Sequence, residues 1–374
     1  MKSIFRKYSG SYRASLIVFG LVLFSFPLSV LAGSVITVTG TIQEAMNAAN
    51  PGDTIVVPPG LYHESVLVDK DDITIRGSRA AVIDASGFEN GIRVGTGEIT
   101  IDPSTGFPVC PPFSVRNFTI DGLTIENAEE NGILLVGADG FRIAGGEYRS
   151  NAEYGPFALC SRNGLIDFNH AEGSDDAVIY VGNSNAVTVS NNHAAKSTIG
   201  IEIENSTNCI VRDNRTIGNT VGILVVVLPG LPIPLTDAVL IQRNELIHNN
   251  RRNPIPPGSG DEAGLLPTGS GILNVGGDRV IIKDNVVMQN DSLGIGIIEN
   301  PFAPLDPRIE PFPDNNQARH NTVLQNGKRP DPLRALYPGA DIIFVTSRGT
   351  GNCFADNIFK TEFPAGVTEP YHCP

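Results

Sequence analysis

Between Phe118 and Val225, one pattern of hydrophobic and polar positions recurs about every 22 residues. Each copy begins with a small residue, usually Gly, and continues as a segment of alternating apolar residues. These anchors are Gly132, Gly155, Val178, Gly200 and Gly222, spaced 23, 23, 22 and 22 residues apart. Alternation with a period of two predicts a strand at each anchor. A repeat of this length predicts stacked units that bury their apolar faces only against one another.

Alignment of the copies separates an inner face from an outer face. The inner positions are apolar throughout and are the predicted core: Ile133, Leu135, Ala158, Ile179, Val181, Ile201, Ile203, Ile223 and Val225. The outer position, two residues after each anchor, varies in chemistry: Leu134, Phe157, Tyr180, Glu202 and Leu224. The inner face therefore predicts the fold, and the outer face is where we look for function.

A second regular feature is an asparagine that follows a short apolar strand in each coil. The residues are Asn169, Asn192, Asn214, Asn244, Asn285, Asn321 and Asn357. Asn tolerates a left-handed backbone, and its amide can bond the same amide one coil away. We expect these residues to form a structural ladder at a corner. With three short strands per coil, the pattern predicts an all-β, single-stranded right-handed parallel β-helix.

Outside the repeat, the chain shows an end cap and several insertions. Thr41 and Glu44 have the spacing of a capping box, which predicts a short helix ending before Pro51. We expect residues 33–72 to form an N-terminal cap containing this helix, residues 73–360 the coils, and residues 361–374 a tail. Insertions interrupt the period at 95–117, 228–236, 250–270, 301–315 and 327–339. They either form a wall over the solenoid or are disordered.

Residues 1–32 have the pattern of a signal peptide. Basic residues precede an apolar run from Leu16 to Leu31, and Val30 and Ala32 are small residues at the expected cleavage site. The run is short for a membrane span and contains Pro27. Ser34 stands where a lipoprotein would need Cys. We therefore expect a secreted or periplasmic protein without a stable membrane span after cleavage.

Charge and cysteine content narrow the partners. The net charge is −13, and loss of the four basic residues of the leader would make it −17, which disfavours nucleic acid. An anionic polymer would need a bridging cation. Of the five cysteines, Cys353 and Cys373 can close a disulfide loop in an oxidising compartment. Cys160 and Cys209 fall inside the repeat, where we expect them to be buried as small apolar residues. We expect a monomer.

Several segments resemble bacterial parallel β-helix repeat proteins of the pectin lyase-like superfamily. They are Pro51-Gly-Asp-Thr-Ile, Asp176-Ala-Val-Ile-Tyr-Val-Gly-Asn-Ser, Gly200-Ile-Glu-Ile-Glu-Asn-Ser, Gly222-Ile-Leu-Val with Leu228-Pro-Gly-Leu-Pro, and Gly351-Asn-Cys-Phe-Ala-Asp-Asn. The resemblance covers most of residues 35–374. It implies the fold and a groove along the first sheet, which the anchor strands form. It does not imply one reaction, since the superfamily includes lyases, hydrolases, epimerases and adhesins. The signatures of polygalacturonases, alginate epimerases and pectate lyases are absent or incomplete.

Acidic and aromatic residues concentrate beside the anchors. Two residues before them lie Glu130, Glu153, Asp176, Thr198 and Thr220, and coils stack roughly 5 Å apart. Stacked carboxylates repel each other, which raises the pKa of at least one and suits a general acid. Our catalytic candidates are Glu153, Asp176, Glu202 and Tyr180. Our substrate-binding candidates are Phe157, Glu130, Asp175 and Glu204, with the aromatic rings as platforms for sugars.

Three interpretations of this acidic cluster remain open: two kinds of chemistry and a purely structural role. Two carboxylates with room for a water suit glycoside hydrolysis. Asp175, Asp176 and Glu153 can instead bind Ca²⁺, which would bridge a polyuronate and acidify its C5 proton. Alternatively, the carboxylates are only solvated turns. We therefore predict an exported protein that binds polysaccharide along the outer face of the first sheet; if catalytic, it is a polysaccharide lyase, a glycoside hydrolase or a uronate epimerase. The alternative is a non-catalytic structural or interaction protein of the cell envelope.

Overall fold

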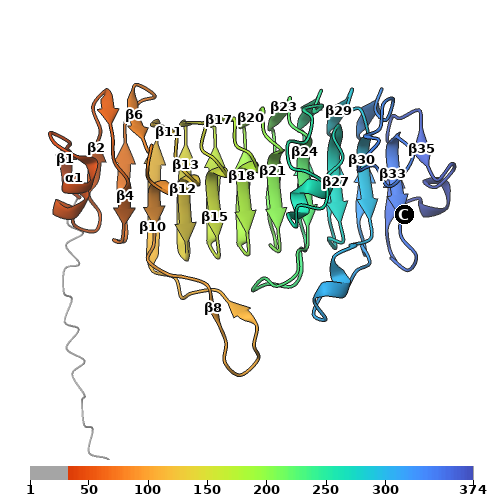
Figure 1. Ribbon diagram of the computed structural model, residues 1–374, viewed down its shortest axis with the longest axis horizontal. Helices are drawn as coiled ribbons and strands as arrows, with labels where there is room; N and C mark the ends of the chain where they lie inside the picture. The colour runs from red at the N-terminus through yellow and green to blue at the C-terminus, as the bar shows by residue number, and fades with distance from the viewer. Residues whose placement is uncertain (1–32, 374) are drawn as a thin grey trace, which may run out of the picture. The chain divides into compact units, whose positions relative to one another are not determined.

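The computed structural model describes residues 33–373, which form a right-handed parallel β-helix with three short strands per coil (Figure 1). The predicted fold class is confirmed. The proposed signal peptide, residues 1–32, lies outside the described residues. Within 33–373, no helix is long and apolar enough to cross a membrane.

Sheet A is parallel and has 12 strands. They are β1 (Val35–Thr37), β2 (Thr54–Val56), β5 (Thr74–Arg76), β10 (Val115–Asp121), β13 (Ala138–Ala144), β16 (Arg162–Asp167), β19 (Asn185–Ser190), β22 (Ile210–Arg212), β25 (Leu240–Gln242), β28 (Ile281–Lys283), β31 (Gln317–Arg319) and β34 (Cys353–Ala355).

Sheet B is parallel and has 10 strands. They are β3 (Gly60–Tyr62), β6 (Ala81–Asp84), β11 (Thr124–Glu126), β14 (Glu147–Arg149), β17 (His170–Glu172), β20 (His193–Ala195), β23 (Arg215–Ile217), β26 (Glu245–Ile247), β29 (Val286–Met288) and β32 (Thr322–Leu324).

Sheet C is parallel, has 11 strands and contains the anchor segments. Its strands are β4 (Val66–Val68), β7 (Asn90–Val94), β12 (Asn131–Val136), β15 (Tyr154–Leu159), β18 (Ala177–Gly182), β21 (Ile199–Glu204), β24 (Val221–Val226), β27 (Ser270–Val275), β30 (Leu293–Ile298), β33 (Ala340–Val345) and β35 (Glu362–Phe363). All nine predicted inner residues are buried in one continuous core. The outer column is also confirmed, since Phe157 pairs with Tyr180, Tyr180 with Glu202, and Glu202 with Leu224.

The anchor position is Gly in most coils because the inner residue of sheet B crowds it. A Cβ at Gly155 would lie 2.5 Å from the Val178 carbonyl oxygen and 3.3 Å from the Tyr148 side chain. Val178 is the exception among the five anchors and is fully buried. In the following two coils, the sheet B residues in register with Tyr148 are Ala171 and Ala194. These small side chains leave the volume that the Val178 side chain fills.

The predicted asparagine ladder is present along its whole length. Each Nδ2 donates to the Oδ1 of the next Asn, from Asn169 to Asn357, over 2.9 to 3.1 Å. The ladder residues do not themselves adopt the left-handed backbone, which corrects our expectation. The residue before each one does, for example Asp213 and Asp284, both with φ of 57°. The strained position is therefore exposed at the corner, and the Asn that follows turns its amide into the coil.

A second ladder was not predicted. Asn219, Asn249, Asn290 and Asn326 bond in the same way at the corner that precedes sheet C, and the ladder ends on Asp341. Insertions of unequal length separate these residues in the sequence, so their spacing does not show that they stack on one another.

The stack begins with α1 (Ile42–Ala48), which lies at the N-terminal end in Figure 1. Thr41 and Glu44 form the predicted capping box, and Ile42 and Met46 are buried against the first coil. Three short 3₁₀ helices occur in the described chain: η1 (Glu262–Leu265), η2 (Ala303–Leu305) and η3 (Glu369–Tyr371). The insertion at 95–117 contains an antiparallel hairpin of β8 (Thr100–Ile101) and β9 (Pro108–Val109).

The cysteines follow the prediction in part. Cys353 and Cys373 form a disulfide, and Cys209 is buried and free, as expected. The interpretation of Cys160 was wrong, because it forms a disulfide with Cys110 of the first insertion. The insertion follows β7 and extends past β12 to the end of β15, where the two Cα atoms are 5.5 Å apart. Nothing in the periodicity indicates that path.

Candidate functional site

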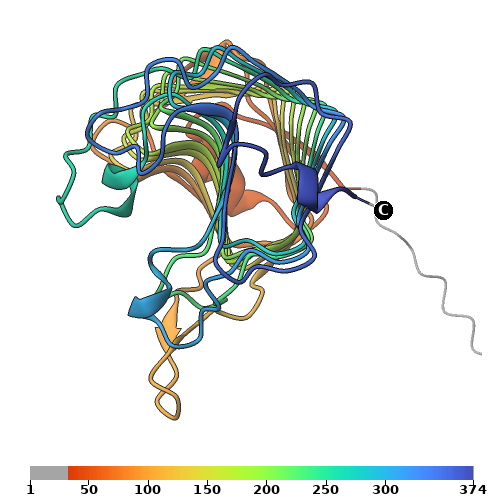
Figure 2. The same cartoon turned by 90° about the vertical axis from the view of Figure 1, so that its right-hand side faces the viewer.

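Insertions flank the outer face of sheet C on two sides. Figure 2, a view along the coil axis, shows the loop with η1 leaving the coils at one side and the loops with β8 and η2 at another. We call residues 250–270 and 327–339 the first wall, and residues 95–114, 228–236 and 301–313 the second wall. Polar contacts hold both walls in place, so these insertions form walls beside the sheet.

The first wall is held by a buried ion pair. The Arg334 guanidinium donates to the carbonyl oxygens of Gly264 and Ile255 at 2.9 and 2.8 Å. It also lies 3.3 Å from the Asp331 carboxylate, and the exposed fractions of the two side chains are only 6% and 4%. Asp331 in turn accepts the Thr268 N–H at 3.1 Å. The loop that carries η1 is thus fixed above the sheet.

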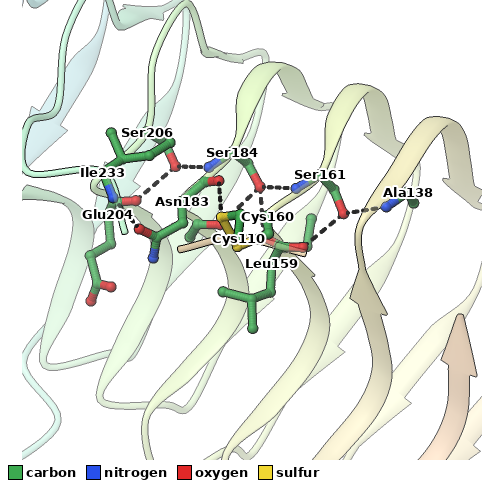
Figure 3. Close-up of a disulfide and its surroundings, with 12 residues drawn as sticks. Cys110, Ala138, Leu159, Cys160, Ser161, Asn183, Ser184, Glu204, Ser206 and Ile233 are labelled. Carbon is green, nitrogen blue, oxygen red and sulfur yellow. Dashed lines mark hydrogen bonds between the residues drawn. A yellow bond between two sulfur atoms is a disulfide. The ribbon is translucent and has the colours of Figure 1, made fainter. Parts of the chain in front are cut away.

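The second wall is held by two asparagines, a disulfide and an arginine. Asn205 donates to the Leu228 carbonyl and accepts its N–H, at 2.9 and 2.7 Å. Asn183 accepts the Ile233 N–H at 3.0 Å, beside the disulfide of Cys110 that ties the first insertion to the coil (Figure 3). The loops also bond to one another: Arg308 donates to the Leu231 carbonyl at 2.9 Å, and its guanidinium lies 4.0 Å from the centre of the Phe107 ring.

Between the walls, a cavity of about 550 Å³ lies over β15, β18, β21 and β24. Its lining is strongly acidic, with eight carboxylates: Glu129, Glu153, Asp175, Asp176, Glu202, Glu204, Asp261 and Glu262. Among the described residues that line it, none is Lys, Arg or His. The nearest ion pair joins the exposed Asp175 to Arg251, whose guanidinium is 4.0 Å away. The lining of the cavity therefore carries acidic side chains without basic ones to neutralise them.

The structure brings together five of the eight predicted site residues as lining: Glu153, Asp175, Asp176, Glu202 and Glu204. Glu130 does not line the cavity; its neighbour Glu129 does. Phe157 and Tyr180 lie beneath it, with their rings stacked 4.4 Å apart. Tyr180 is 7% exposed, so the expectation that its ring is a platform for a sugar was wrong. The walls flank the outer face, which was one of the two alternatives that the sequence left open for the insertions.

Two tyrosines each donate a hydrogen bond to one carboxylate of the cavity. The Tyr154 hydroxyl donates to Asp176 Oδ2 at 2.9 Å, and the Tyr180 hydroxyl donates to Glu204 Oε1 at 2.6 Å. Burial and the neighbouring carboxylates raise the pKa of both phenols, so both stay protonated. Their rings are 4.8 Å apart, which makes the two pairs one packed unit. The tyrosines orient these acids and leave the outer carboxylate oxygens free.

Glu202 differs from its neighbours in having no such partner. It lines the cavity, it is 5% exposed, and within residues 33–373 its carboxyl group has no hydrogen bond. Asp176 Oδ1 is likewise buried without a partner in the described chain. An unpaired buried polar group costs about 1–3 kcal/mol, so such groups need an explanation. A ligand or substrate that bonds to them would supply one.

Burial sets the protonation of the three acids. It raises the pKa of Glu202 well above its usual range, with Asp176 and Glu204 adding repulsion. It raises the pKa of Glu204 to about 7, against the opposing effect of the Tyr180 hydrogen bond. It raises the pKa of Asp176 to about 6, where the Tyr154 hydrogen bond again opposes it. Burial therefore favours the protonated form of Glu202, whereas Asp176, with a pKa of about 6, is largely ionised near neutral pH.

The expected Ca²⁺ ligands do not assemble. Asp175, Asp176 and Glu153 do not bring three carboxylate oxygens within reach of one cation. In the described chain, the acidic side chains close enough to do so are Asp278, Glu310 and Asp314, whose ligand atoms lie within 4.8 Å of one another. That group is not part of the cavity lining. The chemistry of the cavity is better explained by its protonated and ionised acids.

Three residues of the site were missed in the sequence. Tyr154 lies one residue before its anchor and directly after Glu153. The alignment of the copies therefore could have identified it. Asp261 and Glu262 belong to the insertion at 250–270, which has no counterpart in the other coils. Only the fixed path of the first wall places them over the sheet.

The fold is that of a right-handed parallel β-helix repeat protein. The model of the right-handed beta helix region matches residues 66–228. No curated protein matches the sequence.

Solved structures resemble the chain in fold. The A-module of mannuronan C-5 epimerase AlgE4 from Azotobacter vinelandii is 17% identical, with a TM-score of 0.57 over 89% of this chain and 96% of that one. The AlgE6 A-module from the same organism is 15% identical, with a TM-score of 0.52 over 85% and 90%. DFA-IIIase from Arthrobacter chlorophenolicus A6, without its lid and in complex with GF2, is 15% identical, with a TM-score of 0.55 over 89% and 92%.

Proposed function

We propose that this protein is an exported carbohydrate-active enzyme that cleaves a glycosidic bond of an uncharged glycan. The observation that carries the proposal is the acid pair of the cavity: Glu202 is 5% exposed and has no hydrogen bond among the described residues, and Asp176 has one buried oxygen, Oδ1, without a partner there. Two of the fold neighbours are named as a mannuronan epimerase and a DFA-IIIase, the latter in complex with GF2. Their names support carbohydrate chemistry on this scaffold.

Glu202 is the proton donor in this proposal. A general acid must be protonated at the working pH and must lie within reach of the leaving oxygen. Burial raises the pKa of Glu202 and so favours its protonated form, and the absence of a partner among the described residues leaves its proton available to a substrate. When the glycosidic bond breaks, Glu202 gives its proton to the departing oxygen. The resulting carboxylate recovers a proton from water in the next step.

Asp176 is the base or the nucleophile. Tyr154 holds one of its oxygens and fixes the direction of the other, Oδ1, which has no partner in the described chain. With a pKa of about 6, Asp176 is mostly ionised at pH 7 and can either accept a proton from water or attack the anomeric carbon. Glu204, held by Tyr180, is placed to bond sugar hydroxyls.

An uncharged substrate fits the lining better than a polyuronate. A uronate carboxylate would enter a cavity with eight carboxylates and no lining cation among the described residues. Like charges at such distances repel, and the described residues of the cavity contain no grouped ligand set for a bridging cation. Sugar hydroxyls, in contrast, donate hydrogen bonds to carboxylates. The acidic lining therefore favours a neutral glycan over the uronate that we also considered from the sequence.

Export rests on the leader and on the disulfides. The sequence of residues 1–32 has the features of a signal peptide. The two disulfides, Cys110–Cys160 and Cys353–Cys373, are typical of an oxidising compartment. We accordingly place the enzyme outside the cytoplasm, in the medium or in the periplasm.

A product screen tests the proposal. The protein is incubated with neutral polysaccharides, such as fructans, glucans and xylans, and with polygalacturonate and alginate. New saccharide products from a neutral glycan, without ultraviolet-absorbing unsaturated ends, are expected. The Asp176→Asn protein should release at least a hundredfold less product. Glu245→Gln, which changes an exposed acid on sheet B, is the matched control and should keep full activity.

Two results would contradict the proposal. Unsaturated ends from a polyuronate would show a lyase. Binding of a glycan without any product would show a non-catalytic binding protein, as in our alternative interpretation.

A further inference from the structure

A second pocket adjoins the acidic cavity and has the opposite character. It measures about 290 Å³ and lies over the next three coils of sheet C. Its floor is formed by the outer side chains of β27, β30 and β33, namely Leu273, Val275, Leu293, Ile298 and Ile343. Leu266, Leu336 and Tyr337 of the first wall cover it. The pocket is thus an apolar chamber built between the sheet and a loop.

The two pockets adjoin each other. Glu262, Leu266 and Phe302 line both of them, so these three residues are the boundary between the acidic cavity and the apolar pocket. The change in chemistry follows one column of the sheet. The outer residue is Glu202 in β21, Leu224 in β24 and Leu273 in β27.

The pocket is held open by its frame. Its covering loop is the one that the buried Arg334 and Asp331 fix to the sheet. Ser292 strengthens the frame by accepting the Asp331 N–H at 2.8 Å. A dry cavity of about 150 Å³ lined by Leu, Ile and Phe is enough to bind a small apolar molecule. This pocket is larger and has a fixed wall.

Two of the four polar side chains at the apolar pocket are already engaged. The Arg334 guanidinium is bonded to Gly264, Ile255 and Asp331, and the Ser292 hydroxyl is bonded within the first wall. Glu262 and Tyr337 are the other two, which are too few to replace the bonds to water that a sugar ring would lose there. The lining residues are mostly aliphatic, which suits a flexible chain better than a flat ring. Water also has little reason to occupy the pocket.

We propose that the apolar pocket binds an aliphatic chain attached to the glycan, so that the substrate is an alkylated or acylated sugar. Its polar part lies in the acidic cavity, and its chain passes Leu266 and Phe302 into the apolar pocket. This inference rests on the proposed function for the identity of the polar part. The rim agrees with it, because Leu333 and Leu336 are 68% and 72% exposed beside the pocket. Entry of an amphiphile would cover them.

The test uses a neutral fluorescent probe, N-phenyl-1-naphthylamine, and its displacement from the full protein. Octyl glucoside should displace the probe, whereas glucose at the same concentration should not. Ala335→Trp places an indole in the pocket and should weaken probe binding at least tenfold. Ala80→Trp, at an exposed turn between β5 and β6, is the matched control and should bind like the wild type. Leu336→Glu should also weaken binding, with the similarly exposed Leu61→Glu as its control.

The outcomes separate this inference from the proposed function. If Glu202→Gln abolishes turnover while octyl glucoside still displaces the probe, both are supported. If no glycan is cleaved but the alkyl glucoside displaces the probe and the sugar alone does not, the apolar site stands and the proposed function fails. Turnover of a neutral glycan without any probe binding overturns the inference alone. A dimer that Leu336→Glu converts to a monomer also overturns it, because a second copy would then cover the pocket.

Discussion

Two sets of buried polar side chains lie only a few residues apart in this protein, and they differ in how their hydrogen bonds are satisfied. In the asparagine ladder, each amide from Asn169 to Asn321 bonds to a backbone carbonyl and to the next amide. In the acidic cavity, Glu202 and Asp176 Oδ1 lack partners among the described residues. Both sets sit on the same coils and are enclosed by the same fold.

The difference separates structure from chemistry. A fully bonded polar row stabilises the corner and has no capacity left for a ligand. A partly bonded acid pair costs stability in the free protein and recovers it when a substrate supplies the missing bonds. Buried polar residues on a solenoid are therefore better classified by their unsatisfied groups than by their burial. Changing one member of each set tests whether this difference holds.

The largest effect is expected for Glu202→Gln. The amide matches the shape of the protonated acid, so the fold should be kept, but it cannot donate the proton that the leaving oxygen needs. Turnover of the neutral glycan should fall about 10³-fold, within the range of general acid catalysis. The measurement is the rate of product release at pH 7, with Glu245→Gln as the control.

The thermal stability of Glu202→Gln completes the comparison. Because a buried acid without a partner is replaced by a neutral group, the melting temperature should stay the same or rise. A large fall in melting temperature, together with the lost activity, would place Glu202 among the structural residues and remove the distinction between the two sets.

Asn214→Ala should have the reverse effect. Its Oδ1 accepts the N–H and Nδ2 of Asn192, and its Nδ2 donates to Val189 and Asn244. Truncation leaves several buried groups unpaired at about 1–3 kcal/mol each, so we expect a loss of about 4 kcal/mol in the free energy of unfolding. Denaturant unfolding measures it, with the exposed Asn50→Ala as the control. Activity well below the melting temperature should remain within twofold of the wild type; a catalytic defect would show that the ladder also shapes the site.

Most of the fold was predictable because periodicity reports it directly. The 22-residue spacing of the anchors, the inner apolar column and the single Asn corner each repeat often enough to be read without a structure. The second ladder and the disulfide of Cys110 were not predictable, because they depend on how insertions of unequal length return to the stack. The left-handed residue at the corner was also predicted one position too late. Asn is common in the left-handed conformation, so the ladder Asn was chosen instead of the residue before it.

The site was predictable only on its sheet side. Asp176, Glu202 and Glu204 belong to the repeat, and their alignment placed them on one face. Asp261 and Glu262 come from the first wall, whose position depends on the ion pair of Arg334 with Asp331. Periodicity also could not show that the walls would cover Tyr180. It therefore located the acids, whereas their enclosure, which raises their pKa values, required the structure.

That enclosure predicts a pH dependence of stability, the smallest of the expected effects. Burial raises the pKa of Glu204 in the folded protein to about 7, from an ordinary 4.5, and the pKa of Asp176 to about 6. The folded state thus holds these protons more tightly than the unfolded chain. The contribution of each group is complete below its unfolded pKa and is lost as the pH rises through its folded pKa.

For Glu204 alone, the loss should be roughly 3 kcal/mol between pH 4.5 and pH 8, since one unit of pKa difference is worth about 1.4 kcal/mol. Denaturant unfolding across this range measures the slope. Glu204→Gln keeps an acceptor for the Tyr180 hydroxyl but cannot titrate, so its profile should be flatter than that of the wild type. The asparagine ladder has no ionisable group, and Asn214→Ala should shift the whole profile downward without changing its slope. If Glu204→Gln and the wild type lose stability in parallel, then Glu204 is not the buried acid that the cavity makes it, and the contrast between the two sets would rest on Glu202 and Asp176 alone.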